Sequence, residues 1–228
     1  MSRSTMMLGA YVTLAVLQVL GRLLEISALA SVTKPLLMPV LAGFLVVSSP
    51  RPFTRMVRVV LAALAFSWLG DVLLMGSGDG FFLAGLGGFL VAQLLYIVAF
   101  APVVRASTPP RPPVWALVYV LYGAGLVAVL APDLGDKLLP VALYAVAICT
   151  MAIVASGVNR WTAIGAFFFL MSDSLIALTR LADVLDFSVP TRETLIMATY
   201  TLAQGLLVYG VVVVQREIWR ETPQAVAS

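Results

Sequence analysis

The stretch from Phe81 to Val104, FFLAGLGGFLVAQLLYIVAFAPVV, contains no charged residue. A helix needs about 20 apolar residues to cross the roughly 30 Å hydrocarbon core of a bilayer, so this stretch is long enough to span a membrane. The rest of the chain has the same character, because 61% of its residues are hydrophobic and only 11% are charged. Soluble domains carry about 25% charged residues. The composition therefore predicts an integral membrane protein.

Unbroken apolar runs favour transmembrane helices over a β-barrel, whose strands alternate between lipid-facing and lumen-facing residues. Breaks rich in glycine, proline, serine and aspartate separate the runs, the most pronounced being the proline-rich segment Thr108–Pro113. We predict an all-α, polytopic transmembrane helix bundle of about eight spans, forming a single transmembrane domain over residues 1–228. The predicted spans are Met6–Ala28, Lys34–Val47, Phe53–Met75, Phe81–Val104, Val114–Leu130, Leu138–Val158, Trp161–Leu181 and Thr194–Gln215.

Basic residues are distributed unevenly between the two sides of this topology. One side collects Arg3, Arg51, Arg55, Arg58, Arg105, Arg111, Arg160, Arg216 and Arg220, and the other collects Lys34, Lys137, Arg180 and Arg192. Because cytoplasmic loops carry the excess of lysine and arginine, both termini are predicted to be cytoplasmic. The Ala/Val/Leu/Arg-rich composition favours a bacterial cytoplasmic membrane. The net charge of +3 reflects loop arginines and does not indicate nucleic-acid binding.

The two halves of the chain resemble each other at an offset of about 102 positions. Asp71 and Asp173 are separated by this offset, and Lys34 and Lys137 nearly so. A repeat of this kind predicts two parallel halves of four spans, related by an axis along the membrane normal. Chance similarity between apolar helices is the alternative interpretation.

Asp71 and Asp173 are the informative residues, because an ionisable group at the centre of a span costs at least about 2.5 kcal/mol. Each follows an arginine, Arg58 or Arg160, by thirteen positions, which corresponds to about 20 Å along a helix. The two carboxyls are thus expected at similar depth, facing one polar cavity. In the alternative, each aspartate only binds a neighbouring helix.

Other polar side chains occur at helical spacing in the predicted spans. Gln93 and Tyr96 share a face of the fourth span, and Tyr200 and Gln204 are at i and i+4 in the eighth. We expect these four to line the cavity, although interhelical hydrogen bonding explains them equally well. Lys34, next to Pro35 at the predicted start of a helix, is expected near the cavity mouth as an anion site, or else reaches the membrane interface.

The chain contains no histidine and one cysteine, Cys149. A thiolate zinc site and an internal disulfide are therefore excluded, and a zinc hydrolase is disfavoured. Cys149 lies in an apolar run and is expected to pack as a small hydrophobic residue. We predict neither a metal nor another cofactor.

Several segments resemble the YhhN-type lysoplasmalogenase family of multi-pass membrane alkenyl ether hydrolases. These segments are Lys34-Pro35, Leu69–Leu74, Phe82–Gly85, Gln93–Tyr96, Gly165-Ala166, Phe169, Ser172-Asp173, Tyr200 and Ala203-Gln204. The resemblance implies a lysophospholipid substrate whose vinyl ether bond is hydrolysed, releasing a fatty aldehyde and a glycerophospho-alcohol. It implies that Asp71 and Asp173 are catalytic. The implied substrate-binding residues are Lys34, Gln93, Tyr96, Tyr200, Gln204 and Ser172. Family members often have a histidine at the position of Gln93.

The implied chemistry suits a pair of carboxyls. Protonating the alkenyl carbon gives an oxocarbenium ion, so one carboxyl must carry its proton near neutral pH while the other, ionised, stabilises the cation and activates water. The sequence leaves open which aspartate takes which role. A membrane transporter or lipid-binding protein that uses the same buried aspartates is the alternative. Release of aldehyde discriminates between the two functions.

Overall fold

The structure, a computed structural model, describes residues 2–106, 114–182 and 184–221, and over these residues it contains helices and no strands. The helices are α1 (Arg3–Leu23), α2 (Ser27–Ser48), α3 (Arg55–Leu73), α4 (Asp79–Ala106), α5 (Val114–Leu134), the 3₁₀ turn η1 (Gly135–Lys137), α6 (Leu138–Ser156), α7 (Arg160–Arg180) and α8 (Val189–Glu221). Seven segments of the described chain are long and apolar enough to cross a membrane, one of which comprises most of α5, η1 and α6. The predicted all-α transmembrane bundle is confirmed. The proline-rich break at 108–113 lies outside the described residues.

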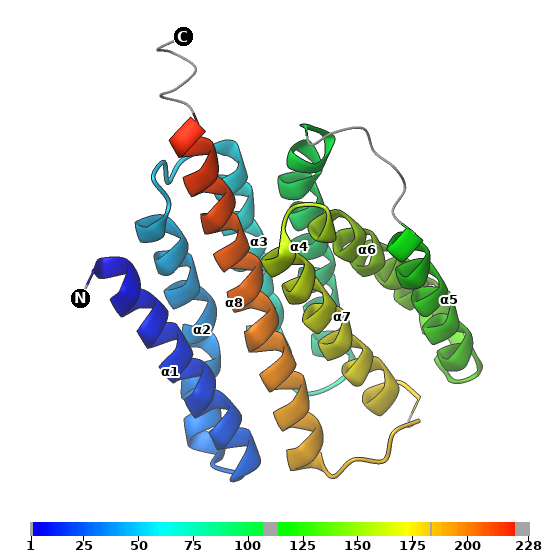
Figure 1. Ribbon diagram of the computed structural model, residues 1–228. Helices are drawn as coiled ribbons and strands as arrows, with labels where there is room; N and C mark the ends of the chain where they lie inside the picture. Colours follow the sequence, from blue (N-terminus) through cyan, green and yellow to red (C-terminus); the bar gives the residue numbers. More distant parts are fainter. Residues whose placement is uncertain (1, 107–113, 183, 222–228) are drawn as a thin grey trace.

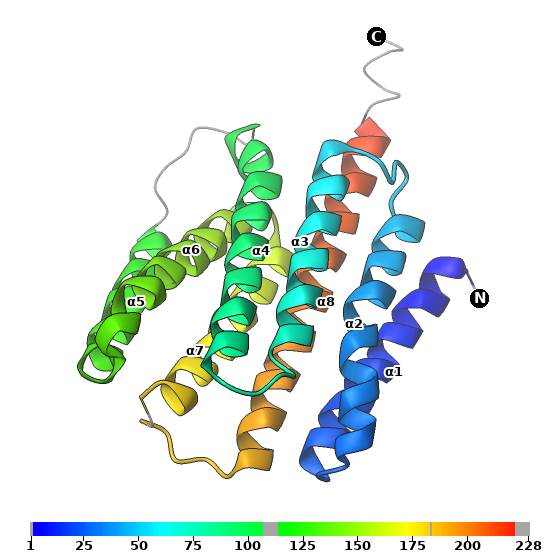
Figure 2. The same ribbon diagram turned by 180° about the vertical axis from the view of Figure 1, so that it is seen from behind.

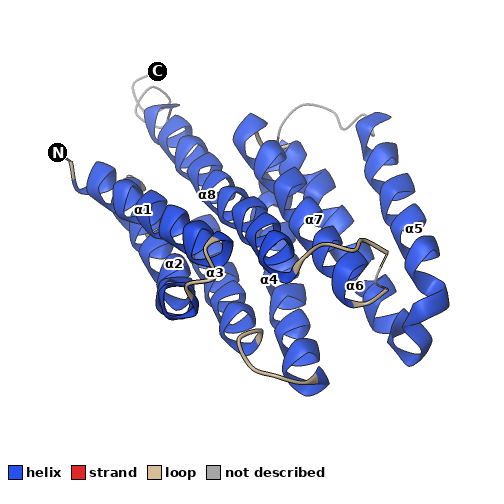
Figure 3. Ribbon diagram, turned by 90° about the horizontal axis from the view of Figure 1, so that it is seen from below, coloured by secondary structure: helices blue, strands red, loops and turns tan. Residues whose placement is uncertain are grey.

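The helices form two layers that run up and down. Helices α1, α8 and α7 lie in front in Figure 1, and α2, α3 and α4 lie in front in the reverse view of Figure 2. Helix α6 packs against both α4 and α7. Helix α5 packs mainly on α6 and stands at the edge of the bundle, as the end-on view of Figure 3 shows. The described ends of α1 and α8 nearest the termini point to the same end of the bundle.

Local capping chemistry fixes where several helices begin. The Thr54 hydroxyl accepts a hydrogen bond from the backbone N–H of Val57 at the start of α3. At the start of α7, Asn159 and Thr162 form a reciprocal capping box. Glu25, in the turn between α1 and α2, has a φ of 56°, which is uncommon for a residue with a side chain. This turn reverses the chain and lays α2 against α1.

Helix α2 differs from its predicted extent. It begins at Ser27 rather than Lys34 and continues through Pro35 and Pro39. Pro39 has no N–H to donate to the carbonyl of Pro35, and the indole N–H of Trp68 in α3 donates to that carbonyl instead, at 2.9 Å. The helix therefore starts seven residues before the predicted start at Lys34, and the neighbouring helix satisfies the carbonyl that Pro39 leaves free.

Small residues allow the tightest helix pairs, α3 with α4 and α7 with α8, to approach closely. A Cβ added at Gly88 would lie 3.1 Å from the backbone nitrogen of Gly70, which precedes Asp71. A Cβ added at Gly165 would lie 2.9 Å from the carbonyl oxygen of Ala203, which precedes Gln204. The glycine contacts therefore set the position of polar residues in the core.

The two halves of the chain share some packing relations but not their ion pairs. Helices α2 and α3 are neighbours, as are their proposed counterparts α6 and α7. Lys34 pairs with Asp71, whereas Lys137 pairs with Asp79 at 3.3 Å rather than with Asp173. Lys137 is thus not the functional counterpart of Lys34, and the internal repeat stays a prediction.

Candidate active site

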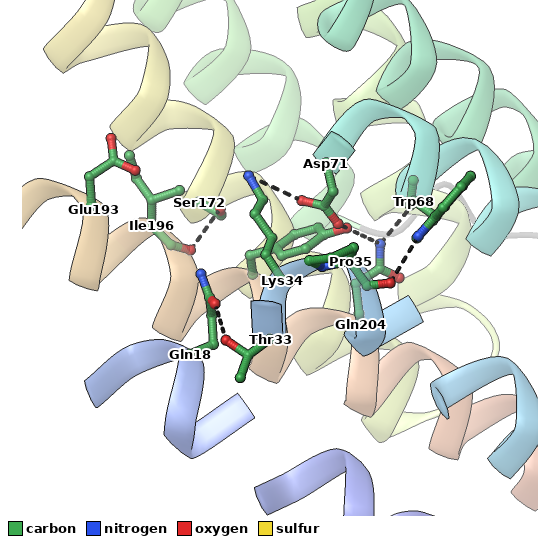
Figure 4. Close-up of polar contacts among 12 residues, drawn as sticks. Gln18, Thr33, Lys34, Pro35, Trp68, Asp71, Ser172, Glu193, Ile196 and Gln204 are labelled. Atoms are coloured by element: carbon green, nitrogen blue, oxygen red, sulfur yellow. Dashed lines mark hydrogen bonds and ion pairs between the residues drawn. The ribbon is translucent and has the colours of Figure 1, made fainter. Parts of the chain in front are cut away.

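Asp71 lies in the core, where three helices meet. Its carboxyl is 2% exposed. Lys34 of α2 places its Nζ 3.6 Å from Asp71 Oδ1, and the hydroxyl of Tyr200 in α8 donates to Asp71 Oδ2 at 2.7 Å. Figure 4 shows the lysine and the carboxylate pointing toward each other. Lys34 is itself buried inside α2 rather than at a helix start, as was predicted, and its ammonium group forms an ion pair with Asp71.

The other predicted polar residues of α4 and α8 extend this network. The hydroxyl of Tyr96 donates to the Gln204 carbonyl oxygen at 2.6 Å. The Gln204 amide nitrogen donates to Ser67 Oγ at 3.0 Å and to the hydroxyl of Tyr200 at 3.4 Å. Sequence analysis did not single out Ser67. A continuous chain of hydrogen bonds therefore links Asp71 in α3 with α8 and α4.

Asp173, in α7, has a different environment. Its carboxyl accepts a hydrogen bond from the hydroxyl of Tyr144 in α6, and no salt bridge to it occurs within the described residues. Sequence analysis missed Tyr144, because it stands alone in an apolar run and the repeat offset maps it onto Ala42.

An apolar cavity of about 60 Å³ lies beside Asp173. Helices α4 and α5 provide two of its walls but do not pack extensively on each other over the described residues. Besides Asp173, the polar groups of the lining are Tyr144, Ser174 and the thiol of Cys149. The remaining walls are apolar and include Phe82, Leu86, Phe89, Leu126, Leu130, Val141, Ile148 and Leu170.

The two aspartates do not line this cavity together, because Asp71 is not part of its wall. The expected polar cavity is replaced by an apolar one. Phe89 connects the two environments: its ring lines the cavity and packs edge-on against Tyr200, the partner of Asp71, with centroids 5.7 Å apart. The aspartates thus belong to adjoining environments that meet at an aromatic cluster.

Gln93 and Ser172, the two remaining predicted site residues, lie outside the hydrogen-bond network around Asp71. Gln93 is fully buried and lies beside Tyr144, near enough for a side-chain interaction. Neither atom of its amide, however, has a hydrogen-bond partner of good geometry among the described residues. The hydroxyl of Ser172 donates to the backbone carbonyl of Ile196 at 3.2 Å and joins α7 to α8 (Figure 4). Ser172 therefore holds helices together in this structure, whereas Gln93 has free hydrogen-bonding capacity beside Tyr144.

The arrangement suits proton chemistry on an apolar molecule. Within the described part of the chain, no group of three or more His, Cys, Asp or Glu side chains is placed to hold a metal. An apolar chain entering the cavity would meet one carboxyl without a cationic partner. A second carboxyl, paired with a lysine, lies in the adjoining environment.

Comparison with known proteins finds one family model and several relatives that share a name. The YhhN family model matches residues 29–211. A Mycobacterium bovis protein named lysoplasmalogenase is 40% identical over 136 residues, which cover 57% of this chain and 52% of that protein. The human lysoplasmalogenase TMEM86B is 32% identical over 187 residues, which cover 80% of this chain and 75% of that protein.

The match to human lysoplasmalogenase TMEM86A is 32% identical and covers 67% of this chain and 65% of that protein. The matched region spans about half the length of the mycobacterial relatives. No solved structure matches the chain significantly. The family match covers most of the chain and includes both aspartates, Lys34 and the polar residues of α4 and α8. This chain therefore belongs to the YhhN family.

Proposed function

We propose that this protein hydrolyses the vinyl ether bond of lysoplasmalogens, releasing a fatty aldehyde and a glycerophospho-alcohol. The observation that carries the proposal is the apolar cavity with the Asp173 carboxyl in its wall. A cavity of this kind favours apolar groups and presents one acid to them. The names of the mycobacterial and human relatives support the same activity.

We assign Asp173 as the general acid. It is partly buried in an apolar wall and forms no salt bridge within the described part of the chain, and such surroundings favour the neutral, protonated carboxyl. Its Oδ2 accepts the hydrogen bond from Tyr144, which orients the group and leaves Oδ1 to carry the proton. Tyr144 is in this account a positioning residue.

The reaction consumes one water molecule. Asp173 gives its proton to the alkenyl carbon that is not bonded to oxygen, and the π electrons of the double bond form the new C–H bond. The resulting oxocarbenium ion is attacked by water at the carbon bonded to oxygen, and the Asp173 carboxylate takes a proton from that water. The hemiacetal hydroxyl then gives up its proton as the bond between its carbon and the glycerol oxygen breaks, the glycerol oxygen receives a proton, and the aldehyde is released.

Asp71 is proposed to stabilise the cation rather than to touch it. Its ion pair with Lys34 favours the ionised carboxylate, and interactions between charges are strengthened in surroundings of low dielectric constant. Tyr200 and Gln204 hold this carboxylate in place. Tyr96 and Gln93 are proposed to shape the site from α4, with Gln93 offering its unpaired amide to water or substrate.

The proposed location is a bacterial cytoplasmic membrane, with both termini in the cytoplasm. The arginines of the described loops and helix ends support this orientation, because they concentrate at the end of the bundle that carries the termini. The substrate would enter sideways from the lipid, between α4 and α5.

The direct test is to incubate the purified protein with a lysoplasmalogen and to measure free aldehyde. The matched control substrate is the lysophospholipid with a saturated alkyl ether, which has the same shape but cannot form an oxocarbenium ion by protonation. We expect aldehyde from the vinyl ether alone. Proton-coupled uptake of a solute without any aldehyde release would favour the transporter instead.

A further inference from the structure

A second, open cavity of about 490 Å³ adjoins the apolar one. The two share Leu74, Phe82 and Leu181 in their walls. The second cavity lies where α3 and α7 end and α4 and α8 begin, at the end of the bundle away from the termini. Its charged lining residues are Lys137, Arg180, Arg192 and Asp79, and we refer to it as the basic basin.

We propose that the basic basin binds the phosphate group of the lysophospholipid whose hydrocarbon chain occupies the apolar cavity. This inference rests on the proposed function and deepens it by naming the group that the protein recognises. In such a lipid the phosphate is separated from the vinyl ether by the glycerol backbone alone. A cationic basin that shares walls with the cavity of Asp173 matches this order of groups.

The arginines of the basin are held by a common acidic partner, Glu193 of α8. Arg180 forms a hydrogen-bonded ion pair with Glu193 Oε1. Arg192 Nε lies 3.7 Å from Glu193 Oε1, and Arg22 of α1 lies 3.9 Å from Glu193 Oε2. Glu193 thus fixes three arginines from three helices around one point.

The side chains that form these ion pairs do not balance one another in charge. Arg22, Arg180, Arg192 and Lys137 contribute four positive charges, and Glu193 and Asp79 contribute two negative ones, which leaves an excess of two. The Arg192 side chain is 22% exposed, and its Nε is buried without a hydrogen-bond partner in the described structure. A buried donor without a partner and an excess of positive charge carry a free-energy cost that the single negative charge of a bound phosphodiester would partly offset.

The chemistry of arginine suits phosphate in particular, because the planar guanidinium offers parallel N–H donors to two phosphate oxygens. An arginine that merely reaches the membrane interface extends into the head-group layer. Arg180 and Arg192 instead line the basin next to the apolar cavity, and Glu193 holds them there.

The test measures binding without hydrolysis. A saturated alkyl-ether lysophosphatidylethanolamine and the corresponding alkylglycerol, which lacks the phosphate, are titrated in a phosphate-free detergent. Arg192→Gln and Lys137→Gln are each expected to weaken binding of the phospholipid by about 10- to 100-fold, as the loss of a charge-assisted hydrogen bond does. Binding of the alkylglycerol should not change. Arg192→Lys, which keeps the charge but loses the paired guanidinium donors, should recover only part of the phospholipid affinity.

The matched control is Arg58→Gln, on the exposed face of α3 near its opposite end, which should leave both affinities unchanged. Equal losses for the two ligands in the basin variants, or no loss, would overturn the phosphate site. Inorganic phosphate that binds as tightly as the phospholipid would show that the basin recognises a free anion and not the lipid.

The assay separates this inference from the proposed function. Arginine-dependent binding of the phospholipid by a protein that releases no aldehyde from lysoplasmalogen would keep the phosphate site and reject the hydrolase. Aldehyde release at equal kcat/KM from lysoplasmalogen and from alkenylglycerol, in wild type and variants alike, would keep the hydrolase and reject the phosphate site.

Discussion

Asp71 and Asp173 carry the same side chain into two different surroundings. Asp71 is paired with Lys34 and bonded by Tyr200, whereas Asp173 accepts a hydrogen bond from Tyr144 in an apolar wall. The sequence indicated both aspartates, because a charge within a span is conspicuous. It did not distinguish their roles or reveal Tyr144, since the partner of a buried group is set by the packing of distant helices.

The assignment of Tyr144 as a positioning residue predicts a loss of turnover in Tyr144→Phe. Removing one hydrogen bond to a charged or acidic group costs about 1.5 kcal/mol, which corresponds to roughly a tenfold lower kcat, with KM nearly unchanged. Tyr122→Phe is the matched control, because it removes a comparable tyrosine hydrogen bond to Ser174. Equal effects of the two substitutions would assign Tyr144 a structural role only.

The buried Lys34–Asp71 ion pair predicts that removing one partner destabilises the protein more than removing both. Because breaking a buried pair leaves an uncompensated charge, Asp71→Asn and Lys34→Met should each lower the free energy of unfolding by about 3–5 kcal/mol. The double variant should recover much of this loss. Thermal unfolding in detergent of the wild type, the two single variants and the double variant measures this interaction. Additive losses of stability would show that the two groups do not interact.

At the scale of the helices, the apolar runs and their breaks predicted most of the architecture. The observed helix boundaries differ from the predicted ones where a neighbouring helix provides a hydrogen-bond partner that the helix itself lacks. Helix α2 continues through Pro39, where Trp68 satisfies the freed carbonyl of Pro35. Such a contact joins two helices, so periodicity within one segment does not reveal it. The apolar cavity was not predicted for the same reason, since its walls come from four helices.

Close helix contacts predict that glycines differ sharply in their tolerance of a methyl group. In Gly165→Ala the new Cβ would lie 2.8 Å from the backbone nitrogen of Leu207, so α7 and α8 must separate. We expect a loss of about 1–3 kcal/mol in stability and reduced turnover. Gly87→Ala, whose Cβ would meet no atom within 4 Å, is the control. Equal melting temperatures of the two variants would contradict the packing of α7 on α8.

The whole molecule exposes apolar side chains that only a lipid environment can cover. Leu139 and Val146 on α6 are 68% and 65% exposed, and Val118 on α5 is 64% exposed. These faces surround a core that contains ion pairs and hydrogen-bonded polar groups. The molecule therefore presents lipid-compatible walls outside and keeps its buried carboxyls and their partners inside.

The proposed orientation is testable with reporter fusions. Fusions in the α3–α4 and α5–α6 connections, at Gly78 and Gly135, should report an external location. Fusions in the α2–α3 and α6–α7 connections, at Pro52 and Gly157, should report the cytoplasm, because the arginine-rich ends of the helices lie there. The reverse pattern would put the basic basin on the cytoplasmic side and overturn the proposed orientation.

The central claim is that Asp173 protonates the alkenyl carbon of a lysoplasmalogen, and hydrolysis in heavy water tests it most directly. The aldehyde is trapped by immediate reduction and its deuterium content is measured by mass spectrometry. The account predicts one deuterium on the carbon next to the aldehyde carbon. It also predicts that Asp173→Asn, which retains size and polarity, releases aldehyde roughly 10²- to 10⁴-fold more slowly. Aldehyde without deuterium at that carbon, or undiminished release by a correctly inserted Asp173→Asn protein, would contradict the account.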